Sequence, residues 1–148
     1  MPERETLQRV EQDKRAGKSA STQAGEFVRE EIHHIREGAH GARSAKQAIA
    51  IGLSKARRAG VDLPPPKRGT VSAKTRTNAI SAYRAGKRHT RGGASPKRSR
   101  ATMRALKREG HAAASHRALA RHAHNVARKK SRAERSATAR KAARTREA

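Results

Sequence analysis

The sequence contains no cysteine and no tryptophan, and it has one phenylalanine and one tyrosine among 148 residues. Without cysteine the chain can form no disulfide, no thiolate zinc site and no thiol nucleophile. Two aromatic residues are too few for an aromatic-centred core, or for stacking on single-stranded bases as the main binding mode. No apolar run approaches the roughly 18 residues of a membrane-spanning helix. We therefore expect a cytoplasmic protein with no membrane partner.

Large apolar residues are also scarce. Val, Ile, Leu and Phe number 16 of 148 residues, about 11%, below the roughly 20% at which a high net charge indicates disorder. Alanine supplies 30 of the 49 residues counted as hydrophobic, and it favours helix but buries little area. We predict an all-α chain, with a small helical hairpin and a basic, alanine-rich, partly disordered helical tail.

Acidic residues are nearly absent from the C-terminal part of the chain. Residues 67–148 carry 25 Lys/Arg against three acids, Glu109, Glu134 and Glu147, for a net +22 of the chain's formal +25. Residues 1–66 carry 12 Lys/Arg and 9 Asp/Glu, for a net +3. Solubility needs a net charge of only a few units. This imbalance predicts binding to a polyanion, and the commonest polyanion in a cell is nucleic acid.

The cations of this C-terminal basic region, residues 67–148, should bind phosphates with little regard to base sequence. If about ten phosphates are contacted, log K should fall with log salt at a slope of about −9. Duplex DNA is favoured over single strands because aromatics are so few, and RNA remains possible. The residues predicted to bind nucleic acid are Lys67, Arg68, Arg84, Lys87, Arg88, Arg91, Lys97, Arg98, Arg100, Arg104, Lys107, Arg108, Arg117, Arg121, Arg128, Lys129, Lys130 and Arg132.

The most structured part is predicted at residues 22–63, as an αα-hairpin of two amphipathic helices. Thr22 is the expected N-cap of the first helix, and Ser44 with Gln47 forms a capping box at the start of the second. Gly52 lies in mid-helix at a cost of about 1 kcal/mol, so it should mark a close helix contact. The residues expected to be buried are Phe27, Val28, Ile32, Ile35, Ile49 and Leu53.

Residues 1–21 are predicted to form an N-terminal helix that frays, because Leu7 and Val10 alone cannot anchor it. On the other side of the hairpin, three consecutive prolines make residues 64–69 a semi-rigid, extended linker. This linker is expected to separate the hairpin from the basic tail.

The tail, residues 70–148, is predicted to be a string of short capped helices that order on a partner. Each has at most two large apolar residues, too few to fold a bundle. The first should end at Gly86 and be followed by a basic loop over residues 87–94. Ser95-Pro96 starts the next helix as an N-cap followed by proline. With Lys97-Arg98 it also resembles the Ser-Pro-basic-basic units of linker-histone tails, which bind A·T-rich minor groove.

No catalytic set can be assembled, so we expect neither an enzyme nor a cofactor. Glu30 with His33, and Glu31 with His34, place a carboxylate and an imidazole on one helical face, as in di-iron bundles. Those sites need a second helix with the same residue types, and residues 45–59 contain no acid and no histidine. We therefore predict no metal site and attribute the pattern to local ion pairing.

Two other roles for the hairpin stay open. Lys46, Lys55, Arg57 and Arg58 on its second helix suggest a sequence-reading helix-turn-helix, although the connection exceeds the usual three to four residues. Ile51 lies off the apolar stripe, which suggests a second apolar surface for a protein partner or for self-association.

The segment STQAGEFVREEIHHIREGAHGARSAKQAIAIGLSKARRAGVDLPPP at 21–66 resembles a family of small, basic, functionally uncharacterised bacterial proteins. Their shared core is similar to GARSAKQAIAIGLSKARRAG at 41–60, and SRATMRALKREGHAAASHRALARHA at 99–123 resembles longer members. The resemblance implies a bacterial, cytoplasmic setting and no particular activity. By composition, the tail also resembles the Lys/Ala-rich tails of bacterial linker-histone-like proteins, although it uses more Arg and lacks their short tandem repeats.

These observations predict a non-enzymatic, histone-like protein of the bacterial nucleoid that binds duplex DNA largely independently of sequence. The tail should gain helix as phosphates neutralise its self-repulsion. The nearest alternative is an RNA- or ribosome-binding protein. A further alternative is an adaptor whose hairpin binds a protein while the tail tethers it to nucleic acid.

Overall fold

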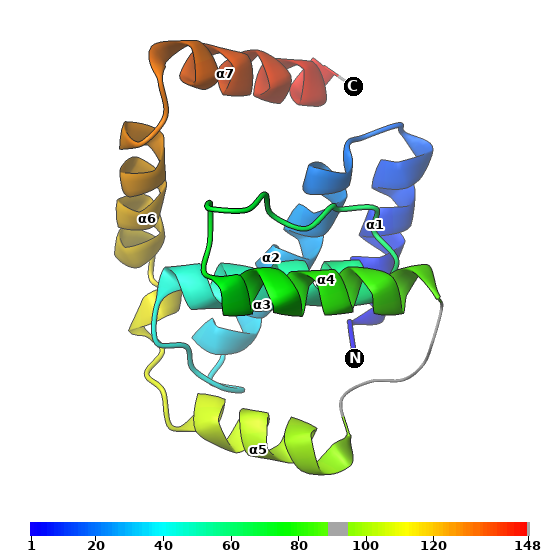
Figure 1. Cartoon of the computed structure of the whole chain (residues 1–148), viewed down its shortest axis with the longest axis vertical. Helices are drawn as coiled ribbons and strands as arrows, with labels where there is room; N and C mark the ends of the chain where they lie inside the picture. Colours follow the sequence, from blue (N-terminus) through cyan, green and yellow to red (C-terminus); the bar gives the residue numbers. More distant parts are fainter. Residues whose placement is uncertain (89–94, 148) are drawn as a thin grey trace.

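The computed structural model describes residues 1–88 and 95–147 (Figure 1). Within these residues the chain forms α-helices and one short 3-10 helix without any strand, so the all-α prediction is confirmed. Arg91 and most of the predicted basic loop 87–94 lie outside the described residues. The elements are α1 (Arg4–Arg15), α2 (Ala20–Arg36), α3 (Ala45–Arg58), α4 (Ala73–Lys87), α5 (Pro96–Lys107), η1 (Ala112–Ala114), α6 (His116–Arg128) and α7 (Arg132–Glu147).

Helices α2 and α3 pack against each other as the predicted hairpin. The close contact expected at Gly52 is confirmed, because a Cβ built there would lie 2.6 Å from Val28 Cα. Ser44 caps α3 as predicted. The predicted cap of α2 was wrong: Ser19 is the N-cap, and its Oγ accepts the Thr22 N–H at 3.4 Å. The helix therefore begins three residues earlier than a cap at Thr22 would place it.

The core around the hairpin is small and rich in alanine. Phe27 and Ile35 are fully buried and belong to two separate clusters. Val61 completes the Phe27 cluster, whereas Ala113 and Ala114 of η1 complete the Ile35 cluster. Of the other residues predicted to be buried, Ile32 is buried, and Val28, Ile49 and Leu53 are partly exposed.

The N-terminal helix α1 packs against α2, so the prediction that it lacks an anchor was wrong. Thr6 is fully buried, and Arg9 Nε donates to Glu26 Oε2 at 2.6 Å. The backbone N–H of Glu3 donates to Glu30 Oε2 at 3.1 Å. These contacts are polar and long-range, which is why counting apolar residues did not reveal them.

Helix α4, the first helix of the predicted tail, crosses α3 closely. Gly86 does not end this helix as predicted but lies inside it. A Cβ at Gly86 would overlap the carbonyl oxygen of Arg57, so only glycine lets the two backbones approach this far. Ala79 and Ala82 on the same helix are buried. The absence of large side chains thus permits packing here rather than preventing it.

The proline-rich linker is bound to the helices on both sides. Arg57, which is buried, donates to the carbonyl oxygens of Leu63 and Pro64 at 3.1 and 3.2 Å. Arg76 on α4 donates to the carbonyl oxygen of Pro66 at 3.2 Å. The linker marks the change in charge, as predicted, but it does not separate α4 from the hairpin.

A second part of the predicted tail also docks on the hairpin. The Gly41 N–H, in the loop between α2 and α3, donates to the carbonyl oxygen of Leu106 at 2.9 Å. Arg36 Nε at the end of α2 donates to the carbonyl oxygen of Ala114 at 2.8 Å. These bonds fix the end of α5 and η1, and therefore the point from which α6 departs.

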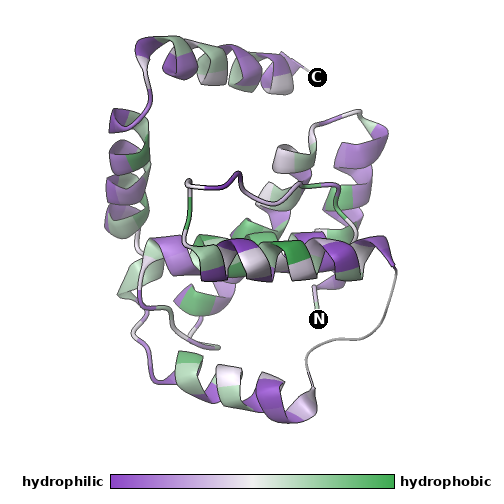
Figure 2. Ribbon diagram, in the orientation of Figure 1, coloured by the Kyte–Doolittle hydropathy of each residue, from purple (hydrophilic) through white to green (hydrophobic). Residues whose placement is uncertain are grey.

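The remaining tail surface is little packed. Leu106 is the one buried residue of α5, and the described residues of α6 and α7 include none. Figure 2 shows apolar positions gathered where α2, α3 and α4 meet, whereas α7 alternates hydrophilic with pale, weakly apolar positions. No helix in the described part of the chain is both long and apolar enough to cross a membrane.

Candidate nucleic-acid interface

The cations predicted to bind nucleic acid are spread over the linker and over α4 to α7. All those described are exposed except Lys130, which is partly exposed. Lys87 forms an ion pair, and the other sixteen that the structure describes form none with any described residue. Unpaired, solvated cations keep their full capacity to bind phosphates.

Two of the three acids of the basic region, Glu109 and Glu134, are already engaged. Glu109 lies 3.9 Å from Arg43 Nε of the hairpin loop. Glu134 Oε2 accepts the Ser131 N–H at 2.7 Å, and Ser131 Oγ accepts the Glu134 N–H at 3.2 Å. This reciprocal pair is a capping box at the start of α7, and the bond from Ser131 lowers the pKa of Glu134. The Ser-x-x-Glu spacing was visible in the sequence and was missed.

Lys87 is a predicted site residue that the fold uses for another purpose. Its Nζ lies 2.9 Å from Asp62 Oδ1 and 5.4 Å from the centre of the Tyr83 ring. Tyr83 Oη donates to the same carboxylate at 2.6 Å. The hydrogen bond from Tyr83 is the main cause of the lowered pKa of Asp62, and Lys87 lowers it further. Asp62 in turn raises the pKa values of Tyr83 and Lys87. We name these three residues the α4 clasp, since they join α4 to the segment after α3.

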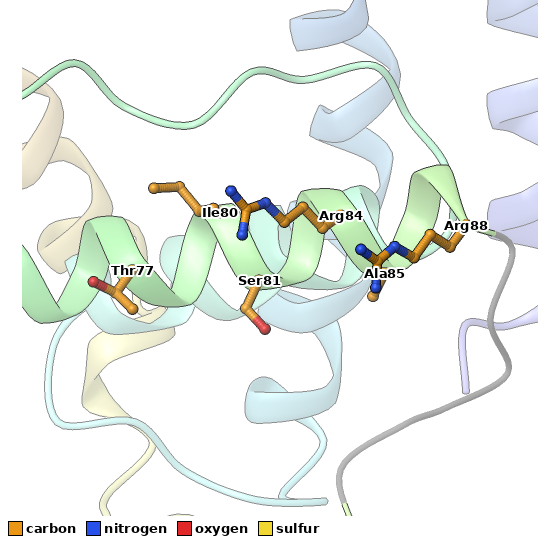
Figure 3. A pocket seen from close by; sticks show the side chains of 6 residues that line it. All are labelled: Thr77, Ile80, Ser81, Arg84, Ala85 and Arg88. Atoms are coloured by element: carbon orange, nitrogen blue, oxygen red, sulfur yellow. The ribbon is translucent and has the colours of Figure 1, made fainter.

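The outer face of α4 carries a shallow polar depression (Figure 3). Arg84 and Arg88 lie one turn apart, and their guanidinium groups point the same way along the helix. The hydroxyl groups of Thr77 and Ser81 lie on the same side of the helix. The two planar guanidinium groups donate hydrogen bonds and the two hydroxyl groups can also donate, which suits binding of an oxyanion such as phosphate.

Neither aromatic side chain is available to stack on a base. Phe27 is fully buried in the hairpin core. Tyr83 is held in the α4 clasp by its hydrogen bond to Asp62. The interface can therefore offer cations and hydroxyls but no aromatic platform.

Helix α5 begins as the sequence predicted. Ser95 is the N-cap and its Oγ accepts the Arg98 N–H at 3.3 Å, while Pro96 occupies the first turn. Lys97 and Arg98 are exposed in that same turn. Two cations next to the positive end of a helix dipole repel each other, and a phosphate at that end would relieve the repulsion.

The arrangement of α3 argues against a helix-turn-helix. Lys55 forms an ion pair with the buried Glu31 at 2.6 Å, and Arg57 is buried with its pKa lowered by that burial. Helix α4 crosses α3 at Gly86, as described above, and covers part of it. Of the four cations that suggested a reading helix, Lys46 and Arg58 are the exposed ones. Two exposed cations on a partly covered helix are too few to recognise a base sequence.

A separate polar cluster lies beside the hairpin core. It consists of three carboxylates, two imidazoles and one ammonium group, which we name the carboxylate–histidine cluster. Sequence reasoning dismissed a metal site here because α3 supplies no acid and no histidine. The structure instead brings in a buried histidine, His40, because the loop that follows α2 folds back, and this loop conformation has no sequence signal. The members of the cluster are Glu3, Glu30, Glu31, His34, His40 and Lys55.

Comparison with known proteins adds one partial match. Residues 12–68 match the model of a family of unknown function, DUF6496, consistent with an uncharacterised domain that spans α2, α3 and the linker. No curated protein and no solved structure matches the chain. The match covers the hairpin but not the helices that carry most of the unpaired cations.

Proposed function

We propose that this protein binds duplex DNA through the exposed cations of its C-terminal helices, largely independently of sequence, as a non-enzymatic component of the bacterial nucleoid. The observation that carries the proposal is the set of sixteen predicted cations that make no ion pair within the described residues. Because this region has too few acids to pair with its cations, its positive charge favours binding of a polyanion.

The spacing of the cations on α5 supports contact along a duplex. Lys97, Arg100, Arg104 and Lys107 follow one another three or four residues apart, so they lie along one face of the helix. At a rise of about 1.5 Å per residue this face is about 15 Å long. Duplex DNA carries about nine phosphates over that length of its axis. A single helix can therefore meet several phosphates at once.

The engagement of both aromatic residues favours a duplex over a single strand. Proteins that bind single strands without sequence preference combine a basic groove with aromatic side chains on which bases stack. Here Phe27 and Tyr83 are committed to the fold, so binding must depend on the phosphate backbone. Backbone binding by charge alone is the typical mode of non-specific duplex binding.

The test is the salt dependence of duplex DNA binding by two matched variants of the full chain. One variant replaces five α5 cations, K97Q, R98Q, R100Q, R104Q and K107Q. The control replaces five exposed cations of the N-terminal part, R4Q, K14Q, R29Q, K46Q and R58Q. Both variants lose five charges, so a difference between them reports contact and not net charge.

We expect the unaltered chain to show a slope of log K against log salt near about −9. Each lost phosphate contact should make the slope less steep by about 0.9, so the α5 variant should lose up to about 4.5. The N-terminal control should keep a slope close to that of the unaltered chain. Equal slopes for the two variants would contradict an interface on the C-terminal helices. Competition between duplex DNA and structured RNA at physiological salt then separates the two nucleic acids, and preference for RNA would overturn the nucleoid assignment.

A further inference from the structure

The carboxylate–histidine cluster has the composition of a metal site. Glu31 is fully buried on α2, His34 follows one turn later, and His40 lies in the loop after that helix and is nearly fully buried. One ligand atom from each of these residues lies within 4.8 Å of the other two. Two imidazoles and one carboxylate form a ligand set that suits zinc and similar divalent ions better than Mg²⁺ or Ca²⁺, which prefer oxygen.

The orientation of His40 points to a cation between it and Glu31. Its Nδ1 lies 3.0 Å from the carbonyl oxygen of Gly41, and a carbonyl can only accept, so Nδ1 carries the hydrogen. Its Nε2 lies 3.0 Å from Glu31 Oε1, and a carboxylate oxygen also only accepts. Two acceptors do not face each other in a buried site unless a proton or a metal ion lies between them. Metal-binding histidines are held in this way, with the second ring nitrogen donating to a backbone carbonyl.

The Glu31 carboxylate is also poorly satisfied for a group with no exposed surface. Neither of its oxygens accepts a hydrogen bond of good geometry, although Lys55 Nζ lies 2.6 Å from Oε2 in an ion pair. Glu30 Oε1 is likewise without a donor, and Lys55 Nζ is 3.9 Å away. Burying such groups is costly, so a further positive charge would stabilise this site.

The buried carboxylates of the cluster outnumber its ammonium group. Glu30 and Glu31 are both buried, and among the described residues Lys55 is the one lysine or arginine that pairs with them. His34 Nε2 lies 2.8 Å from Oε1 of Glu3, whose side chain is half exposed. A divalent cation beside Glu31 would offset the buried negative charge that Lys55 leaves.

We propose that Glu31, His34 and His40 bind a divalent transition-metal ion, with Zn²⁺ as the best-fitting ion. Bonds of about 2.0–2.1 Å to a tetrahedral ion bring its ligand atoms to roughly 3.3 Å from one another. The His40–Glu31 distance is already near this value. The ligand atom of His34 lies within 4.8 Å of the other two, so it needs to shift by no more than about 1.5 Å. The ion would join α2 and the loop that follows it, and so act as a structural site.

The test uses the full chain after chelator treatment, titrated with ZnCl₂ by calorimetry, with thermal unfolding followed by circular dichroism. We expect one tight site and a higher Tm with zinc than without it, since the ion binds the folded state. Co²⁺ in place of Zn²⁺ should give the absorption spectrum of a tetrahedral site. An affinity too weak to raise the Tm, or a spectrum of octahedral hydrated cobalt, would overturn the proposal.

Variants identify the ligands. H34Q and H40Q should each weaken zinc binding by more than the roughly 10–100-fold that is typical for loss of a second-shell partner. The matched control is H33Q, because His33 lies on the same helix next to His34 but is exposed and paired with Glu37 at 3.0 Å. H33Q should bind zinc as the unaltered chain does. If H40Q does not fold, H34Q still decides, because His34 is partly exposed. Equal zinc affinity in H33Q and H34Q would place the ion on other histidines and overturn the assignment.

Discussion

The hairpin and the C-terminal helices are both built from short, alanine-rich helices, yet they treat charge in opposite ways. In the hairpin and its N-terminal extension, acids and bases meet in ion pairs, and some of these are buried, such as Glu31 with Lys55. On α5 to α7 no cation pairs with an acid among the described residues. The first region pairs its acids with bases of the same region, and the second leaves its cations to a partner.

Packing follows the same division. In the hairpin the two backbones approach at Gly52, and α4 joins them through Gly86, so that alanine-sized side chains are enough to fill the space between helices. Helix α7 has no buried residue. Isolated helices of this length are marginal in water even when rich in alanine. The hairpin is therefore stabilised by its own packing, whereas α7 depends on local helix propensity and on whatever neutralises its charge.

Hydrogen exchange of the full chain should expose this difference most strongly. We expect amides of α3 to open only with much of the global unfolding free energy, of the order of 5 kcal/mol or more, and those of α7 to open locally. We expect α3 amides to exchange at least about a hundredfold more slowly than α7 amides. Exchange measured residue by residue by NMR tests this expectation, and amides of α7 as protected as those of α3 would contradict it.

Adding duplex DNA should then reduce the difference in amide exchange rate between α3 and the C-terminal helices. Phosphates neutralise the repulsion along the basic helices, so protection of α5 to α7 and helicity by circular dichroism should both rise. The control is the same mixture at about 1 M salt, where the screening length is about 3 Å and binding should be lost. Unchanged protection at saturating DNA and low salt would mean that the helices do not order on the nucleic acid.

The position of α4 is the next feature to test, because it belongs to the basic region by charge and to the hairpin by packing. G86A should destabilise the chain by about 1–3 kcal/mol, since the added Cβ meets the Arg57 backbone and not a flexible side chain. Denaturant unfolding followed by circular dichroism measures the change.

The matched control for this substitution is G25A. Gly25 lies within α2, and a Cβ built there meets nothing within 4 Å. Alanine there should be neutral or should stabilise the helix by up to about 1 kcal/mol. If G86A proves as harmless as G25A, then α4 is not held against α3 in solution, and the predicted boundary at the prolines would be restored.

Sequence periodicity identified the hairpin well because its signals are local. The apolar spacing that leads to Ile35, the cap at Ser44 and the mid-helix Gly52 all lie within one or two helical turns of the features they specify. The exposed cations of the basic region were also predictable, since a region so rich in Lys and Arg has almost no acid with which to pair. Composition and short spacing are enough for such features.

Apart from the caps at Ser19 and Ser131, the features that sequence reasoning missed depend on tertiary contacts and not on local spacing. One contact that anchors α1 is the bond from the Glu3 N–H to Glu30, 27 residues away. From sequence alone Gly86 is read as a helix terminator, but in the structure it allows α4 to contact the backbone of α3. His40 has no helical partner in sequence and meets Glu31 only because the loop folds back. Polar contacts of this kind follow no period, so only tertiary structure reveals them.

The smallest expected effect concerns the α4 clasp, in which Asp62 accepts from Tyr83 and Lys87. The pKa of Asp62 is lowered, so its stabilising effect is present above its ordinary value of 3.8 and is lost as the pH falls through the lower folded-state value. The pKa values of Tyr83 and Lys87 are raised, so their contribution is present below their ordinary values of 10.0 and 10.5 and is lost at higher pH.

The stability difference between the unaltered chain and D62N should therefore be constant across neutral pH and should shrink at both extremes. Because other carboxylates also titrate in acid, it is the difference between the two proteins, from denaturant unfolding at each pH, that isolates Asp62. Y83F should reduce the same difference, since the Tyr83 hydroxyl is the main cause of the lowered pKa of Asp62. A difference that does not change with pH would mean that α4 is held by its glycine crossing alone, and that Lys87 is as free to meet phosphate as Arg84 and Arg88.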